Sequence, residues 1–105
     1  MSASTERRAM RDVLASWSLM TPAELAAFLS VSEDQAHRLL DAGRIPSVDR
    51  GCGSRRSLAV DPIDAAVYVL AERDGINSEA YWERHGEAAV DRARAYVQRI
   101  RKMVA

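Results

Sequence analysis

The basic residues of this chain have the chemistry of phosphate and guanine recognition. Arginine supplies all but one of the 15 basic residues, and its planar guanidinium makes paired hydrogen bonds to phosphates and to guanine. Residues 44–60 hold four arginines and only one acid, Asp49, although the whole chain has 15 basic and 15 acidic residues. Arg55 and Arg56 directly follow the glycine-punctuated stretch 51–54, which predicts a turn. The sequence therefore predicts a basic loop on a protein of zero formal net charge.

Catalytic and metal-binding chemistry is not predicted. The chain has one cysteine, Cys52, and two histidines, His37 and His85, so it offers neither an internal disulfide nor the spacing of metal ligands. It also lacks a glycine-rich phosphate loop and a local Ser–His–Asp or Cys–His motif. We therefore expect a protein that is not an enzyme and that needs no cofactor and no metal.

Two short helices with well-marked starts precede the basic loop. Thr21 and Glu24 form a capping box, with Pro22 at the first helical position. Ser32 and Gln35 repeat the capping pattern after a very short turn. The apolar residues of both segments recur at helical spacing: Leu25, Phe28, Leu29, Ala36, Leu39 and Leu40. Two helices joined so tightly predict a helix-turn-helix, whose second helix can enter a major groove.

A hairpin and a third helix are predicted to follow. Pro46 keeps the preceding residue out of the helical region, and Leu58 and Val60 alternate with smaller side chains, so extended segments flank the basic loop. Asp61 is then the N-cap of a helix that Gly75 ends. A basic tip on a short ribbon is typical of a wing.

Residues 21–75, in this order, resemble the excisionase family of winged helix-turn-helix domains, which is close kin to the MerR-like DNA-binding domain. The resemblance covers about half of the chain. It is carried by Leu19-Met20-Thr21-Pro22-Ala23-Glu24-Leu25-Ala26, Val31-Ser32, Arg38-Leu39-Leu40, Gly43-Arg44-Ile45-Pro46, Arg55-Arg56 and Asp61-Pro62-Ile63-Asp64. It implies a phage or mobile-element accessory protein or a small transcription factor.

The resemblance also implies which residues contact DNA. It makes residues 32–42 a recognition helix in the major groove, and it places the arginines that follow on the backbone or in the adjacent minor groove. The DNA-binding residues implied are Ser32, Gln35, His37 and Arg38 on the helix, Arg44 at its exit, and Arg55 and Arg56 on the wing.

Glu33 and Asp34 depart most from the family's pattern, which tends to have Arg, Ser or Thr there. A like-charge contact with a phosphate at about 4 Å costs roughly 1 kcal/mol in water. The two carboxylates can instead accept hydrogen bonds from cytosine amino groups, or only stabilise the helix N-terminus through its dipole. Ser30 and His37 also depart, since glycine and an aromatic residue are common at these positions.

Flanking helices are predicted on both sides. Residues 1–20 comprise a tail and a helix over 5–17 with a basic outer face, which either covers the core or contacts DNA. Residues 76–105 predict one long helix that begins after Ser78 and runs towards Met103, with Gly86 as its only weak point. Its apolar stripe either folds back on the domain or pairs with a second copy: Trp82, Ala89, Ala93, Tyr96, Ile100 and Met103.

The end of this C-terminal helix is strongly basic. No acid follows Asp91, whereas the basic residues are frequent there: Arg92, Arg94, Arg99, Arg101 and Lys102. Such a segment can hold DNA or an acidic patch on a partner recombinase, or it can be a solvated face that complements the helix dipole.

We therefore expect a mainly α, winged helix-turn-helix protein with a short β-hairpin wing, which binds double-stranded DNA sequence-specifically. If the resemblance holds, it is an excisionase whose copies bind side by side, bend DNA and direct a phage integrase toward excision. The alternatives are a small dimeric transcriptional regulator, a DNA-recognition protein like a phage small terminase subunit, and a protein-interaction module that has lost DNA binding. Without a signal peptide or an apolar run of ~20 residues, we expect a cytoplasmic protein with no membrane partner.

Overall fold

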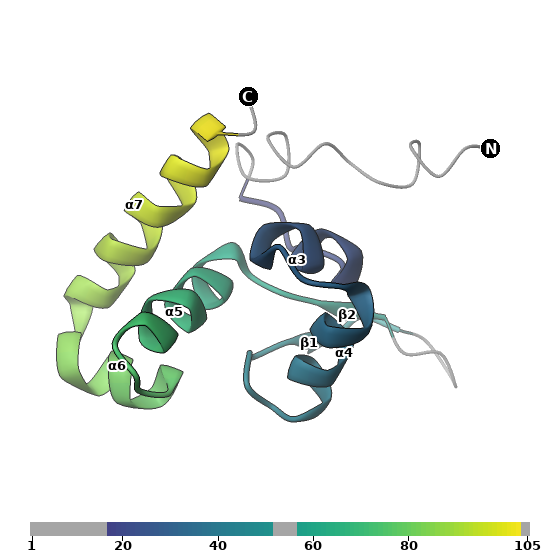
Figure 1. Cartoon of the computed structure of the whole chain (residues 1–105), viewed down its shortest axis with the longest axis horizontal. Coiled ribbons are helices and arrows are strands. Elements are labelled where there is room, and N and C mark those ends of the chain that lie inside the picture. The colour runs from purple at the N-terminus through teal and green to yellow at the C-terminus, as the bar shows by residue number, and fades with distance from the viewer. Residues whose placement is uncertain (1–16, 52–56, 104–105) are drawn as a thin grey trace.

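The protein is mainly α-helical, as predicted, with one short hairpin. The computed structural model describes residues 17–51 and 57–103. In this part of the chain, five helices and two strands follow one another (Figure 1): α3 (Pro22–Leu29), α4 (Glu33–Asp41), β1 (Val48–Asp49), β2 (Leu58–Ala59), α5 (Pro62–Arg73), α6 (Ser78–His85) and α7 (Glu87–Met103). The predicted helix over residues 5–17 and the predicted loop that carries Cys52, Arg55 and Arg56 lie outside the described residues, apart from Trp17.

The predicted N-caps Thr21, Ser32 and Asp61 are confirmed, whereas the C-terminal helix predicted to begin after Ser78 begins at Ser78 itself, with Asn77 as its N-cap. The Thr21 hydroxyl accepts a hydrogen bond from the Glu24 N–H at 3.1 Å, and the Glu24 carboxylate accepts one from the Thr21 N–H at 2.8 Å, so α3 has a complete capping box. The Ser32 hydroxyl accepts from the Gln35 N–H at 3.1 Å and caps α4. The return hydrogen bond from the Gln35 side chain, which would complete the predicted capping box, is not formed. Asp61 is the N-cap of α5. These hydrogen bonds mark the first turns of α3, α4 and α5.

The turn between α3 and α4 contains a serine in the left-handed region. Ser30, with φ 59° and ψ 44°, ends α3, and the Val31 N–H donates to the Ala26 carbonyl at 3.0 Å. This conformation costs a residue with a side chain roughly 1–2 kcal/mol, which is why glycine is common at such positions. The serine closes the turn as a glycine would, at a modest cost.

The hairpin and α5 connect the N-terminal and C-terminal parts of the described chain. β1 pairs antiparallel with β2, with Val48 opposite Ala59 and Asp49 opposite Leu58. Two backbone hydrogen bonds of 2.7 and 2.8 Å join Met20 to Val60, so the chain before α3 is tied to the strand that leads into α5. α5 packs on α3, α6 and α7, and its small residues allow close approach, because Ala65, Ala66 and Ala71 are fully buried or nearly so. No described helix is long and apolar enough to span a membrane.

The prediction of one long C-terminal helix is wrong, because the chain breaks at Gly86 into α6 and α7. Gly86 has φ 55° and ψ −131°, a conformation open essentially to glycine alone. The break lets α7 pack on both α5 and α6. Ala89, Ala93 and Tyr96 of the predicted stripe are buried there, whereas Met103 is 74% exposed. Most of the stripe therefore belongs to the core of one molecule.

Replacing Gly86 by alanine should destabilise the protein by at least about 1 kcal/mol, because a side chain at this φ and ψ is strained even where the surrounding space is open. Urea denaturation followed by circular dichroism measures the loss. An unchanged midpoint of urea denaturation would mean that Gly86 does not have this backbone conformation in solution.

Candidate nucleic-acid interface

The helix α4 exposes the predicted contact residues because its apolar residues lie on the opposite side. Ala36 and Leu40 are buried and Leu39 is packed against the core. The outward residues are accordingly polar: Ser32, Glu33, Asp34, Gln35, His37, Arg38 and Asp41 are all exposed. One exposed surface therefore holds the four sequence-predicted residues of this helix, and the Ser32 oxygen already accepts the capping hydrogen bond.

The exposed surface of α4 is acidic. The helix contains Glu33, Asp34 and Asp41 but only one basic residue, Arg38, so that its formal charge is −2 apart from His37. Glu33 and Asp34 occupy the first turn, where the helix dipole stabilises negative charge. Asp41 lies in the last turn, where the dipole disfavours it. The dipole therefore accounts for two of the three carboxylates.

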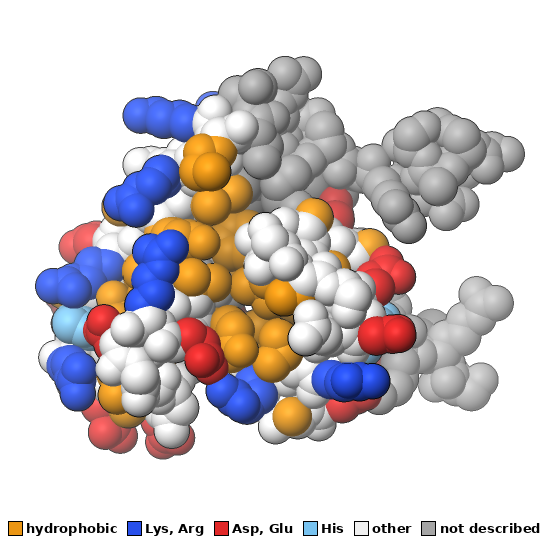
Figure 2. Space-filling model, viewed as in Figure 1, with side chains coloured by type: hydrophobic (Ala, Val, Ile, Leu, Met, Phe, Trp, Pro, Cys, Tyr) orange, Lys and Arg blue, Asp and Glu red, His pale blue; other side chains and the backbone are white. Residues whose placement is uncertain are grey.

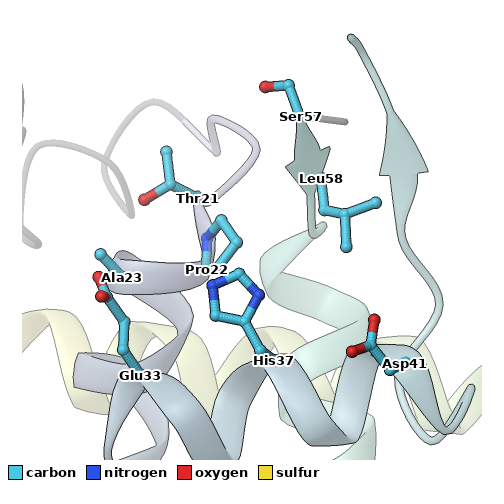
Figure 3. A pocket seen from close by; sticks show the side chains of 8 residues that line it. All are labelled: Thr21, Pro22, Ala23, Glu33, His37, Asp41, Ser57 and Leu58. Carbon is cyan, nitrogen blue, oxygen red and sulfur yellow. The ribbon is translucent and has the colours of Figure 1, made fainter. Parts of the chain in front are cut away.

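A hollow of about 450 Å³ lies beside α4, towards the start of α3 and the strand β2. Its lining is formed by Thr21, Pro22, Ala23, Glu33, His37, Asp41, Ser57 and Leu58. The imidazole of His37 points into this hollow between Pro22 and Leu58, with Glu33 and Asp41 one turn before and one turn after it (Figure 3). His37 therefore faces the base of the hairpin.

Gln35 and His37 are not brought together. Residues two apart on a helix do not face each other, and His37 lines the hollow whereas Gln35 does not. Arg38 falls between them on the exposed side, and no described residue forms an ion pair with it. Of the residues predicted to contact DNA on this helix, Arg38 is therefore the central one, with Gln35 and His37 on either side of it.

Arg44 lies at the exit of α4, as predicted, but is held against α5. Its guanidinium donates to Glu72 Oε1 at 2.6 Å and lies 5.9 Å from the centre of the Tyr68 ring. Burial and the nearby Glu72 carboxylate raise the pKa of Tyr68, which keeps its hydroxyl protonated. Both members of the ion pair remain about half exposed, so it stabilises the fold by at most about 1 kcal/mol. A phosphate can therefore compete with Glu72 for Arg44.

The base of the hairpin is ordered by Asp49. Its carboxylate accepts hydrogen bonds from the N–H groups of Gly51 at 2.8 Å and Ser57 at 3.0 Å, and the Arg50 N–H donates to the Ser57 carbonyl at 2.7 Å. The side chain of Arg50 is exposed. This arginine is absent from the predicted contact residues, although its place within the basic stretch could have identified it. Arg55 and Arg56 lie outside the described residues.

The described residues hold no group of three or more His, Cys, Asp or Glu side chains arranged to bind a metal ion. No protein-family model, curated protein or solved structure matches the chain.

Proposed function

We propose that this chain is a sequence-specific, double-stranded DNA-binding protein of the winged helix-turn-helix type. The observation that carries the proposal is the order of its elements: two capped helices joined by a tight turn, then a hairpin, then α5. In this arrangement α4 is the recognition helix, and the hairpin of β1 and β2, with the loop between them, is the wing.

Each exposed polar residue has a role in this proposal. Arg38, in the middle of the outward side of α4, is suited to paired hydrogen bonds with guanine, and Gln35 to an adenine. Arg44 and Arg50 flank α4 and the wing and would contact phosphates. Arg55 and Arg56 add two further cations to the wing by their sequence position.

The biological role within this class rests on the resemblance to excisionases. Such a protein would bind repeated sites in the cytoplasm, bend the DNA and direct a phage integrase toward excision. A small dimeric regulator and a protein like a phage small terminase subunit would use the same DNA-binding surface.

The test is selection of bound duplexes from a random pool by the purified full chain, followed by a salt titration of the selected sequence. We expect a short motif to be enriched and its affinity to fall steeply as salt rises. Tandem copies of the motif would support an excisionase, and an inverted pair a dimeric regulator. Failure to enrich any sequence at low salt would contradict DNA recognition.

A second candidate function, a protein-interaction module that does not bind DNA, is favoured by the acidity of α4. The double variant Glu33→Gln/Asp34→Asn separates the two. If α4 lies in a groove, removing one like-charge contact with a phosphate should raise DNA affinity by about fivefold, which corresponds to about 1 kcal/mol. Equilibrium binding to the selected duplex measures the change.

The matched control is Glu79→Gln/Glu83→Gln, which removes two exposed carboxylates from α6 and should leave DNA affinity unchanged. Weaker binding by the α4 variant to one motif would indicate that a carboxylate reads a cytosine. No DNA binding by either form would favour the protein-interaction module.

A further inference from the structure

The helix α7 carries a second cluster of basic residues, away from α4. These residues form the α7 basic face: Arg92, Arg94, Arg99, Arg101 and Lys102, all exposed. No acid follows Asp91 in the sequence, so the C-terminal half of α7 is uniformly positive. Figure 2 shows Lys and Arg side chains gathered along the edge of the molecule where Figure 1 places α7.

Contacts within the described part of the chain leave these charges unneutralised. None of the five forms an ion pair with a described carboxylate, unlike Arg44 with Glu72. Arg94 lies 6.0 Å from the ring of Trp17, a contact that keeps its charge. Within the part of the chain that the structure describes, no ion pair therefore offsets the charge of these five side chains.

The helix dipole does not account for this clustering. It favours cations only in the last turn of a helix, which here contains Arg101 and Lys102. Arg92 and Arg94 lie earlier in the helix, where the dipole has no such effect. Arg99 and Lys102 are like charges three residues apart, a spacing that costs a helix roughly 0.2–0.5 kcal/mol. Asp91 lies three residues before Arg94, a spacing of opposite charges that offsets this cost. Helix stability therefore does not account for the cluster, whereas an anionic partner would favour it.

The spacing of the α7 basic face is compatible with contacts to the phosphate backbone of a DNA duplex. At 3.6 residues per turn, Arg92 and Arg99 fall on one edge of the exposed side, and Arg94 and Arg101 on the other. Members of each pair are seven residues apart, about 10 Å along the helix. Between the edges the exposed residues are Glu87, Ala88, Asp91, Ala95, Gln98 and Lys102. The two carboxylates lie in the N-terminal half of α7, so the side that Arg99 and Arg101 border carries no acid. Duplex DNA carries about one negative charge per 1.7 Å of its length, so its backbone offers partners to both edges.

The α7 basic face does not share a surface with α4. The helix packs on α5 and α6, and in Figure 1 it runs along the side of α5 remote from α4 and the hairpin. A straight duplex bound along α4 and the wing would therefore leave α7 free. We propose that the α7 basic face binds the backbone of a second duplex segment without reading its sequence. This inference rests on the DNA-binding function proposed above.

The experiment is duplex bridging by the full chain. A duplex with the selected motif is fixed to beads, and capture of a free, labelled duplex of random sequence is measured. The variant Arg99→Gln/Arg101→Gln removes one cation from each edge, and glutamine has a helix propensity close to that of arginine. We expect at least tenfold less capture, with binding to the motif changed less than twofold. For the random duplex, the slope of log affinity against log salt should fall by about 2.

The matched control is Arg99→Lys/Arg101→Lys, which keeps both charges and should keep the capture. Circular dichroism of all three forms checks that α7 stays helical. Unchanged capture and slope in the glutamine variant would overturn the proposal and point to an acidic protein surface as the partner of α7. If no motif can be selected, α4 has failed as a reading helix, but the same slope measured on random duplexes still tests α7.

Discussion

Replacing Phe28 by alanine is expected to lower the free energy of unfolding by about 3–5 kcal/mol, because a buried aromatic side chain is lost and a cavity remains. Phe28 is 4% exposed, and its ring meets that of Tyr96 edge-on, with 5.8 Å between centroids and 64° between planes. This contact joins α3, at the start of the proposed DNA-binding unit, to α7. Since small domains are stable by only about 5–15 kcal/mol, the variant should lose a large share of its stability.

Urea denaturation followed by circular dichroism measures this loss. The control Phe28→Leu keeps most of the apolar volume and should cost clearly less than the alanine variant. A loss below about 1 kcal/mol for Phe28→Ala would mean that α3 and α7 do not share a core. It would also mean that the C-terminal third contributes little to holding α3 and α4 in place.

The sequence predicts those parts of the fold that are decided by neighbouring residues. The caps at Thr21, Ser32 and Asp61 each involve a hydrogen bond to a residue two or three positions further on, so their pattern is visible in the chain itself. The exposure of Gln35 and Arg38 follows in the same way, since the apolar spacing of α4 fixes which side faces the core.

The features that sequence analysis did not predict depend on distant contacts. A glycine within a helix costs only about 1 kcal/mol relative to alanine, so Gly86 alone did not decide between one helix and two. The break at Gly86 allows α7 to pack on both α5 and α6, and these contacts involve residues far apart in the sequence. The ion pair of Arg44 joins residues 28 positions apart, and no local pattern indicates Glu72 as the partner. Nor does spacing on α4 show that His37 and Leu58 line the same hollow.

Replacing Arg38 by glutamine should lower affinity for the selected motif by about 1–3 kcal/mol, or roughly 5- to 150-fold, and relax specificity at one base pair. Arg38 is central on the exposed side of α4 and has no described carboxylate partner, so its guanidinium can turn to a base without breaking an ion pair. Equilibrium binding to the motif and to its single-base variants measures both effects. Arg84→Gln, an exposed change on α6, should leave affinity for the motif unchanged.

The pattern of loss decides what Arg38 contacts. An equal loss on all sequences, with the salt slope reduced by about 1, would place Arg38 on a phosphate instead of a base. No loss on any sequence would contradict α4 as the recognition helix. In that case the acidic residues would decide what this surface binds: Glu33, Asp34 and Asp41. A helix of formal charge −2 attracts a basic protein partner as readily as it repels a phosphate backbone.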